Sequence, residues 1–244
     1  MLRVYAKDHP DFCFRDVHPR FGDGHQMFVL QCTYDINRSF YGKVHVRRVW
    51  FPMTVNMELV AFENSSVTIH YEARDAADGE LLMTLRSKLA LVNEATRKSE
   101  RLSDEFREKY ARQHQPAFVL PKHEALVIPS NAFCDRLQIR PSDIDSMGHA
   151  NNSVYIRMCS DCATIASVKH GHFLRFGNDL ASRHVKTLNM LYSKECMLGD
   201  VVDVYVWDDA TQNDLLHFQI KNNSIVLFHM LVEYYPVIRT VSKL

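Results

Sequence analysis

The stretch Arg140-Pro-Ser-Asp-Ile-Asp-Ser-Met-Gly-His-Ala-Asn-Asn-Ser-Val-Tyr155 decides the fold of this 244-residue chain. Asp143 and Asp145 alternate around Ile144 as at the end of a strand, and the apolar residues that follow recur at helical spacing. The stretch therefore predicts that a strand, a turn and a helix meet over residues 145–152. This junction would gather two carboxylates, a glycine amide and a histidine at the start of a helix.

The sequence after residue 131 predicts one complete α+β unit. A helix from about Asn151 to Phe173 is apolar on more than one side, which is typical of a buried helix. Segments rich in β-branched and aromatic residues predict strands that wrap around it. These strands are expected at Phe133–Ile144, Ser182–Glu195, Asp200–Trp207, Leu215–Lys221 and Ile225–Tyr235.

The first half of the chain repeats the later strands of this unit. The three matched pairs are Phe28–Tyr34 with Leu188–Tyr192, Gly42–Trp50 with Gly199–Trp207, and Leu81–Asn93 with Ile225–Tyr235. Only 27 residues precede the first matched strand, which leaves too little chain for a strand and a full helix. We therefore predict an incomplete unit over residues 1–113, a proline-marked linker over 114–130 and a complete unit over 131–244.

A sheet without its helix exposes an apolar face. Residues 1–26 or a partner chain must cover that face, because large exposed apolar patches are rare in monomeric proteins. We therefore expect the chain to form a homodimer or to leave apolar surface exposed.

Two motifs resemble those of a known family. The pattern Asp-x-Asp-x-x-Gly-His-x-Asn-Asn-x-x-Tyr, ending at Tyr155, resembles the signature of the hot-dog thioesterases that cleave acyl-CoA and acyl-carrier-protein thioesters. Further on, Tyr192-Ser-Lys-Glu-Cys-Met-Leu-Gly-Asp-Val-Val-Asp203 resembles the Tyr-x-x-Glu-Cys segment of plant-type acyl-acyl-carrier-protein thioesterases. The resemblance is strong over residues 131–240 and weaker over 27–113. It implies a tandem hot-dog fold, in which antiparallel sheets wrap around a central helix and the first unit lacks its helix.

The resemblance also implies an activity, the release of free fatty acid and thiol from a fatty acyl thioester, and roles for individual residues. Asp145 would be the principal catalytic carboxylate, Glu195 the second, and His149 a polarising partner of the thioester. The amides of Gly148 and His149, at the expected helix start, would stabilise the oxyanion. Met147 stands where the plant-type enzymes have asparagine, so this form is closer to bacterial acyl-CoA thioesterases.

Cys196 is an alternative nucleophile, with His149 as its base. Glu195 is favoured over it, because a carboxylate near a helix start needs no further activation and a thiol does. Asp143 and Asp145 could also serve only as helix caps.

Three further polar residues are candidates for substrate binding: Asn151, Asn152 and Tyr155. For all three we favour a structural role, in which they satisfy buried backbone groups.

The composition excludes several classes of protein. The chain has 29 basic and 29 acidic residues, so no nucleic-acid partner is expected. No run approaches the roughly 20 apolar residues that cross a bilayer. Six cysteines without framework spacing favour a reducing compartment, and Cys159-Ser-Asp-Cys162 is interpreted as packing rather than metal binding.

These observations lead to one functional prediction with one alternative. We expect a cytoplasmic acyl thioesterase, with a mitochondrial or plastid location as the alternative address. Its substrate partner would be acyl-CoA or acyl carrier protein, and it would need no metal or organic cofactor. The alternative function is a catalytically inactive acyl-binding or assembly module, which the incomplete first unit and Met147 both suggest.

Overall fold

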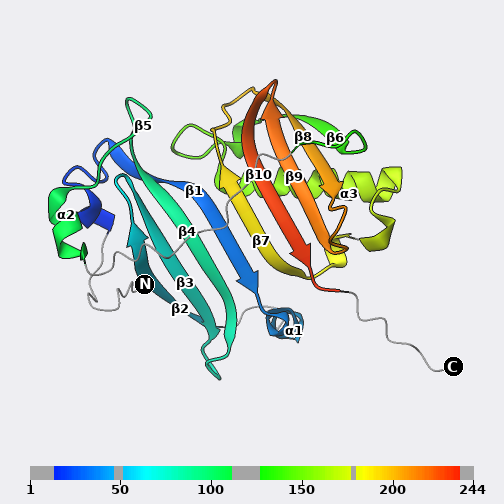
Figure 1. The fold of residues 1–244 in the computed structure, drawn as a ribbon, viewed down its shortest axis with the longest axis horizontal. Coiled ribbons are helices and arrows are strands. Elements are labelled where there is room, and N and C mark those ends of the chain that lie inside the picture. Colours follow the sequence, from blue (N-terminus) through cyan, green and yellow to red (C-terminus); the bar gives the residue numbers. More distant parts are fainter. Residues whose placement is uncertain (1–13, 47–51, 112–126, 177–179, 237–244) are drawn as a thin grey trace. The chain divides into compact units, whose positions relative to one another are not determined.

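The structure is a computed structural model that describes residues 14–46, 52–111, 127–176 and 180–236. Contacts within the chain divide it into two units, Met1–Lys122 and His123–Leu244. The division falls inside the segment 114–130. Each unit is built on antiparallel strands with few helices (Figure 1), so the α+β class predicted from the sequence is confirmed.

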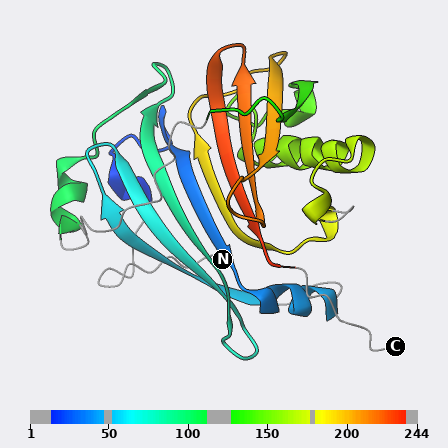
Figure 2. The same cartoon turned by 45° about the vertical axis from the view of Figure 1, so that its right-hand side comes forward.

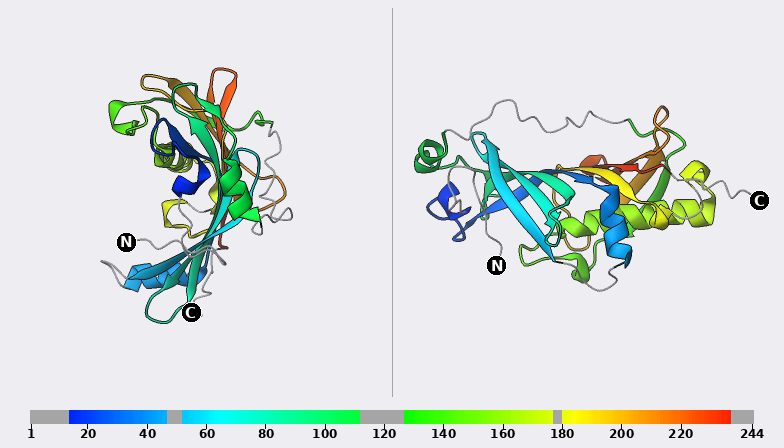
Figure 3. Two further views of the ribbon diagram at one scale, coloured as in Figure 1. Left: turned by 90° about the vertical axis from the view of Figure 1, so that its left-hand side faces the viewer. Right: turned by 90° about the horizontal axis from the view of Figure 1, so that it is seen from below.

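The second unit contains an antiparallel sheet with the strand order β7-β10-β9-β8-β6. Its strands are β6 (Phe133–Gln138), β7 (Val185–Tyr192), β8 (Val201–Asp208), β9 (Leu215–Asn222) and β10 (Ile225–Tyr234). Helix α3 (Asn152–His170) lies along one face of this sheet, as the right-hand view of Figure 3 shows. This is the helix and wrapped sheet that the sequence predicts.

The buried face of helix α3 contains thiols and small side chains. Cys159 and Cys162 are fully buried, and the Cys162 thiol donates a hydrogen bond of 3.2 Å to the Val204 carbonyl oxygen on β8. Burial raises the pKa of the Cys162 thiol to about 12. The helix ends at Gly171, which takes the left-handed conformation that glycine adopts without steric cost.

The junction before α3 differs from the predicted strand. β6 ends at Gln138, and Pro141 opens the 3-10 turn η3 (Pro141–Asp143), where the missing proline amide costs no hydrogen bond. Ile144 then forms only an isolated bridge with Ala150. The prediction of a strand through Ile144 was therefore wrong, and the predicted helix end at Phe173 and strand end at Glu195 were each too late.

The first unit has the strand order β2-β3-β4-β1, with β5 paired to β4. Its strands are β1 (His25–Ile36), β2 (Met53–Phe62), β3 (Ser66–Asp75), β4 (Leu81–Asn93) and β5 (Lys98–Ser99). Strands β1 and β4 contain the first and third segments predicted from the repeat.

The second repeated segment, Gly42–Trp50, was predicted wrongly as a strand. Its described part lies in helix α1 (Arg38–Val46), and residues 47–51 lie outside the described residues. Tertiary contacts hold this helix, because the Lys43 ammonium forms an ion pair of 2.7 Å with Asp75, the last residue of β3, and one of 2.6 Å with Asp78 in the turn that follows. The match to Gly199–Trp207 suggested a strand, and the structure has instead a helix that contacts these distant carboxylates.

One face of the first sheet is covered by two short elements at the same end of the sheet (Figure 2). These are η1 (Phe14–Val17) and α2 (Asp104–Lys109), which are joined by a hydrogen bond of 3.0 Å from the Ser103 amide to the Val17 carbonyl oxygen. Val17 and Phe106 belong to a single hydrophobic core with strands β2, β3 and β4. Residues of η1 therefore cover part of the sheet face that was expected to be exposed because this unit lacks a central helix.

No helix among the described residues is both long enough and apolar enough to cross a membrane.

Phe106 should anchor α2 to the first sheet. It is 1% exposed and its ring meets that of Phe62 edge to face, with 5.5 Å between centroids. We expect Phe106→Ala to lower the free energy of unfolding by about 3–5 kcal/mol, because it removes buried area and leaves a cavity. Urea denaturation followed by circular dichroism measures this change. Met53→Ala, at a strand residue that is 43% exposed, is the control and should change it by less than about 1 kcal/mol; equal losses would contradict the packing role.

Candidate active site

Two hydrogen bonds hold the loop after β7 against the start of α3. The Ala150 amide donates to the Cys196 carbonyl oxygen at 2.8 Å, and the Cys196 amide donates to the Tyr155 hydroxyl oxygen at 2.9 Å. All three residues are buried. These bonds fix Glu195 beside His149, although the two are far apart in the sequence.

The imidazole of His149 lies between two carboxylates. Its Nδ1 is 3.7 Å from Asp145 Oδ2, and its Nε2 is 3.8 Å from Glu195 Oε1. The exposed fractions of the side chains are 11% for His149, 24% for Asp145 and 36% for Glu195. A nearly buried imidazole is thus flanked by two carboxylates that solvent or a substrate can reach.

The tautomer of His149 is indicated by its backbone neighbour. Nδ1 lies 3.2 Å from the Ala150 carbonyl oxygen, which can only accept a hydrogen bond. A proton on Nδ1 makes this contact a hydrogen bond and leaves Nε2, the nitrogen facing Glu195, as an acceptor. The site therefore offers an acceptor nitrogen and a carboxylate side by side.

The turn before α3 orients Asp145. Its Oδ1 accepts a hydrogen bond of 2.8 Å from the Met147 amide, which leaves Oδ2 toward His149. Because the backbone of Met147 makes this contact, its side chain need not be asparagine for the carboxylate to be held.

The same turn corrects one sequence prediction. The Gly148 amide donates to the Asp145 carbonyl oxygen at 3.0 Å, so it is already engaged and cannot serve as an oxyanion donor in this conformation. Gly148 has a φ of 78°, a conformation that other residues rarely adopt, and its observed role is to close the turn.

The helix begins where the sequence predicted, with Asn151 as its N-cap, and this start lies after the two residues that were expected to supply oxyanion donors. The Asn151 side chain accepts hydrogen bonds from the Ser153 amide at 3.0 Å and the Ser153 hydroxyl at 2.7 Å. Gly148 and His149 precede this cap and are not at the helix terminus. The first helical amide, that of Asn152, finds no acceptor among the described residues, as expected for a first-turn donor.

The candidates for substrate binding divide into two groups. Asn151 and Tyr155 use their side-chain oxygens on the backbone of the chain, the exposed Asn151 as the helix cap and the buried Tyr155 as acceptor for the Cys196 amide. Burial raises the pKa of the Tyr155 hydroxyl well above its usual value. Asn152 is half-buried, and its carbonyl oxygen accepts a hydrogen bond of 3.3 Å from the Tyr192 hydroxyl.

Asp143 has a structural role that involves Arg157. Its carboxylate accepts hydrogen bonds from the Arg140 amide at 2.9 Å and from Arg157 Nη2 at 2.8 Å. Its carbonyl oxygen accepts one of 2.9 Å from the Asn151 amide. Asp143 therefore fixes the approach to the helix and does not face His149.

Cys196 is poorly suited to be a nucleophile. Its side chain is fully buried, and burial raises the pKa of its thiol to about 11. Glu195 and Cys196 lie beyond the end of β7 rather than on it, so strand alternation does not orient them. Of the two, Glu195 is the residue near His149.

Comparisons with known proteins give a family match in the second unit and a likeness of fold. Residues 129–230 match the family model of the acyl-ACP thioesterase C-terminal domain. The chain also resembles solved hot-dog structures, so the fold is that of the hot-dog thioesterases, as the motifs predicted. No curated protein is significantly similar to the chain in sequence.

Three solved structures illustrate the likeness. A protein described as an oleoyl thioesterase from Lactobacillus plantarum has a TM-score of 0.64 and 17% identity, over 88% of this chain and 78% of that one. An acyl-ACP thioesterase from Bacteroides thetaiotaomicron has a TM-score of 0.62 and 19% identity, over 88% and 78%. A 12:0-ACP thioesterase from Umbellularia californica has a TM-score of 0.63 and 17% identity, over 90% and 76%. At these identities the likeness establishes the fold, and the family match supports fatty acyl thioester hydrolysis.

The buried thiol gives a test of the site. Cys196 should react with iodoacetamide far more slowly than the exposed Cys134 at pH 8, because its thiol stays protonated below a pKa of about 11 and is covered. Peptide mapping of the native chain by mass spectrometry measures both rates, and unfolding in urea should make them similar. We further expect Cys196→Ser to retain acyl thioester hydrolysis. Rapid native labelling of Cys196 together with inactivation would reinstate it as the nucleophile.

Proposed function

We propose that the second unit hydrolyses fatty acyl thioesters, with acyl-acyl carrier protein as the first substrate to test and acyl-CoA as the second. The observation that carries this proposal is the His149 imidazole held between Asp145 and Glu195, inside a segment that matches the acyl-ACP thioesterase family model. The products would be a free fatty acid and the carrier thiol.

Glu195 is the base in this proposal. It lies opposite the acceptor nitrogen of His149 and is the more exposed of the two carboxylates, so a water molecule could be held by both groups. Asp145 faces the other side of the imidazole and uses one oxygen on the Met147 amide, which suits it to orient the ring and to stabilise positive charge on it. This proposal reverses the order of the two carboxylates that the sequence suggested. Both distances exceed a hydrogen bond and are expected to shorten around a bound substrate.

The reaction then follows from these positions. Water attacks the thioester carbonyl carbon and gives its proton to Glu195, and the carbonyl oxygen becomes an oxyanion. The Asn152 amide, at the positive end of α3, is the donor we propose for this oxyanion. Collapse of the intermediate breaks the carbon–sulfur bond, and the proton passes to the leaving thiolate.

An apolar cavity of about 130 Å³ beside α3 could receive the acyl chain. It comprises one face of the helix and parts of β7, β9 and β10. Its lining residues are Ile156, Ser160, Ala163, Thr164, Leu180, Val185, Leu188, Phe218, Met230, Val232 and Tyr234. Position 156 is one turn after the helix start and position 164 is about 18 Å from it, at about 1.5 Å per residue. An acyl chain whose carbonyl lies at the helix start could therefore run along α3 into this cavity.

The size of the cavity bears on the chain length. A cavity of about 150 Å³ in another protein holds a six-carbon ring. We therefore propose that this cavity takes a short segment of acyl chain. All of its lining residues come from one chain, so a homodimer is not needed to form it. The homodimer itself stays a prediction from the sequence.

Glu195→Gln should lower kcat by about 10²-fold to 10⁴-fold, the range expected for loss of general-base catalysis. Asp145→Asn and His149→Ala should also lower kcat, because one removes the carboxylate that orients the imidazole and the other removes the imidazole that helps to hold the water. Thiol release from acyl-acyl carrier protein and acyl-CoA, detected by absorbance, measures this. Glu233→Gln, at a surface ion pair with Lys186, is the matched control and should leave kcat unchanged. If the unaltered chain binds acyl thioesters without releasing thiol, the protein is an acyl-binding module and the proposal is wrong.

Ala163→Leu should shorten the preferred acyl chain, because Ala163 lines the cavity and is 4% exposed. We expect kcat/KM to fall at least about tenfold for the longest substrate hydrolysed and to change little for the shortest. Loss of one buried methylene contact in an apolar pocket costs about 1–3 kcal/mol, which corresponds to a change of this size. Val168→Leu is the control, since Val168 is on the same helix but 66% exposed. A melting curve separates a change of specificity from loss of the fold. An unchanged chain-length profile in a folded variant would show that the chain lies elsewhere.

A further inference from the structure

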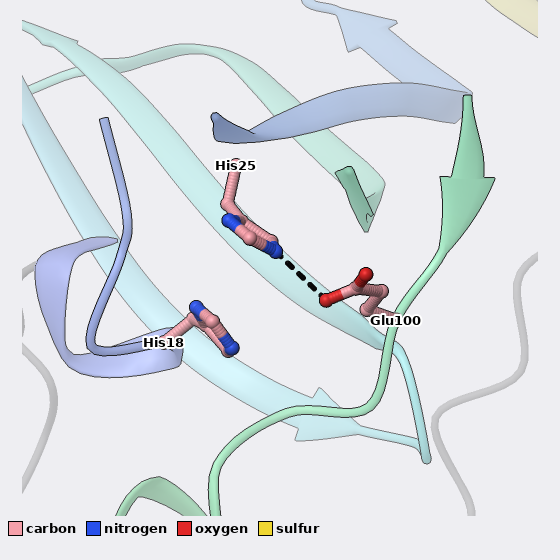
Figure 4. A group of neighbouring side chains, drawn as sticks. All are labelled: His18, His25 and Glu100. Atoms are coloured by element: carbon pink, nitrogen blue, oxygen red, sulfur yellow. Dashed lines mark hydrogen bonds and ion pairs between the residues drawn. The ribbon is translucent and has the colours of Figure 1, made fainter. Parts of the chain in front are cut away.

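A second cluster of chemically competent side chains lies in the first unit, apart from the residues proposed for hydrolysis. His18 follows η1, His25 is the first residue of β1, and Glu100 comes directly after β5 (Figure 4). One ligand atom from each of the three lies within 4.8 Å of the others. Three distant segments of the chain thus present two imidazoles and a carboxylate to one point.

We propose that His18, His25 and Glu100 form a binding site for a divalent transition-metal ion, with Zn²⁺ as the first ion to test. Two imidazoles and one carboxylate are a recurrent zinc ligand set, and imidazole favours such ions over Mg²⁺ or Ca²⁺. A fourth position would be left for water.

The orientation of His25 fits this role. Its Nδ1 lies 3.4 Å from the Asp23 carbonyl oxygen, and its Nε2 lies 2.7 Å from Glu100 Oε2. A histidine whose Nδ1 proton is held by a backbone carbonyl presents Nε2 as its ligand atom. The second oxygen of Glu100 accepts a hydrogen bond of 2.9 Å from Asn93, which restricts the carboxylate.

The alternative to a metal site is a simple ion pair between His25 and Glu100. That pair accounts for the 2.7 Å contact, but it assigns no role to His18, whose ring stacks on that of His25 with 4.3 Å between centroids. A metal ion would take the place of the shared proton, which would pass to the buffer. The His18 Nδ1 accepts a hydrogen bond of 3.1 Å from the Arg20 amide, so binding through Nε2 would move its proton to Nδ1 and release that exposed amide to water.

Two ligand atoms about 2.1 Å from a tetrahedral ion lie about 3.4 Å apart. The three ligand atoms lie within 4.8 Å of one another, so His18 must turn from its stacked position on His25 to bring its nitrogen to this spacing. The 2.7 Å contact between His25 and Glu100 must widen by less than about 1 Å. Glu100 is 36% exposed, and its side chain can rotate to allow this. The bound ion would join η1, β1 and the segment after β5, which are the parts that close one end of the first sheet.

Metal titration of the full chain, with no affinity tag and after treatment with a chelator, tests the site. Isothermal titration with ZnCl₂ should show one equivalent bound, and Co²⁺ should give visible absorption bands of low-coordinate cobalt. Zn²⁺ should also raise the melting temperature. His18→Ala, His25→Ala and Glu100→Gln should each weaken Zn²⁺ binding at least about tenfold.

The matched control is His70→Ala. His70 Nε2 lies 3.8 Å from Glu72 Oε1 in the same unit and lacks a second histidine ligand among the described residues, so Zn²⁺ affinity should not change. Circular dichroism confirms that each variant is folded. Absence of stoichiometric binding by the unaltered chain, or equal binding by the folded His18→Ala and His25→Ala variants, would overturn the proposal. The outcome is independent of whether the second unit hydrolyses thioesters.

Discussion

The attachment of the loop after β7 to the start of α3 is the constraint on which the candidate site depends. The Cys196 amide and carbonyl group are both used, one on the Tyr155 hydroxyl and one on the Ala150 amide. An unpaired buried amide costs about 1–3 kcal/mol, so these partners hold the loop firmly. Glu195 is next to the attached residue, so its backbone is held close to His149.

The turn before the helix positions the second carboxylate, that of Asp145, also through backbone hydrogen bonds. Asp145 is held through a backbone amide, and the chain around it is closed by the amide of Gly148. In this turn the Met147 amide positions the Asp145 side chain and the Gly148 amide closes the backbone, so the oxyanion donor that we propose is the Asn152 amide at the helix start. Structural hydrogen bonding thus decides which groups the site can use for chemistry.

The two units stabilise their sheets in different ways. The second unit covers its sheet with α3, a long helix packed by small side chains and thiols. The described part of the first unit uses η1, α2 and a core of residues such as Phe106 and Tyr110 at one end of the sheet. A metal ion bound by His18, His25 and Glu100 would link the segments that cover this end of the sheet. Such a link would stabilise a small layer that has no long helix.

The sequence by itself determined the class of the fold and the presence of α3, which packs one face into the core and leaves the other exposed. Its motifs also singled out Asp145, His149 and Glu195, which the structure brings together. Helical spacing, β-branched segments and two spaced motifs are local properties, so they can be recognised without coordinates. Only the tertiary structure decided which polar groups are engaged in hydrogen bonds and ion pairs. Gly148 looked available until its amide was found in a turn, and Gly42–Val46 looked like a strand until Lys43 was found beside Asp75. The grouping of His18, His25 and Glu100 was also beyond the sequence, because it arises from contacts between segments that no local pattern connects.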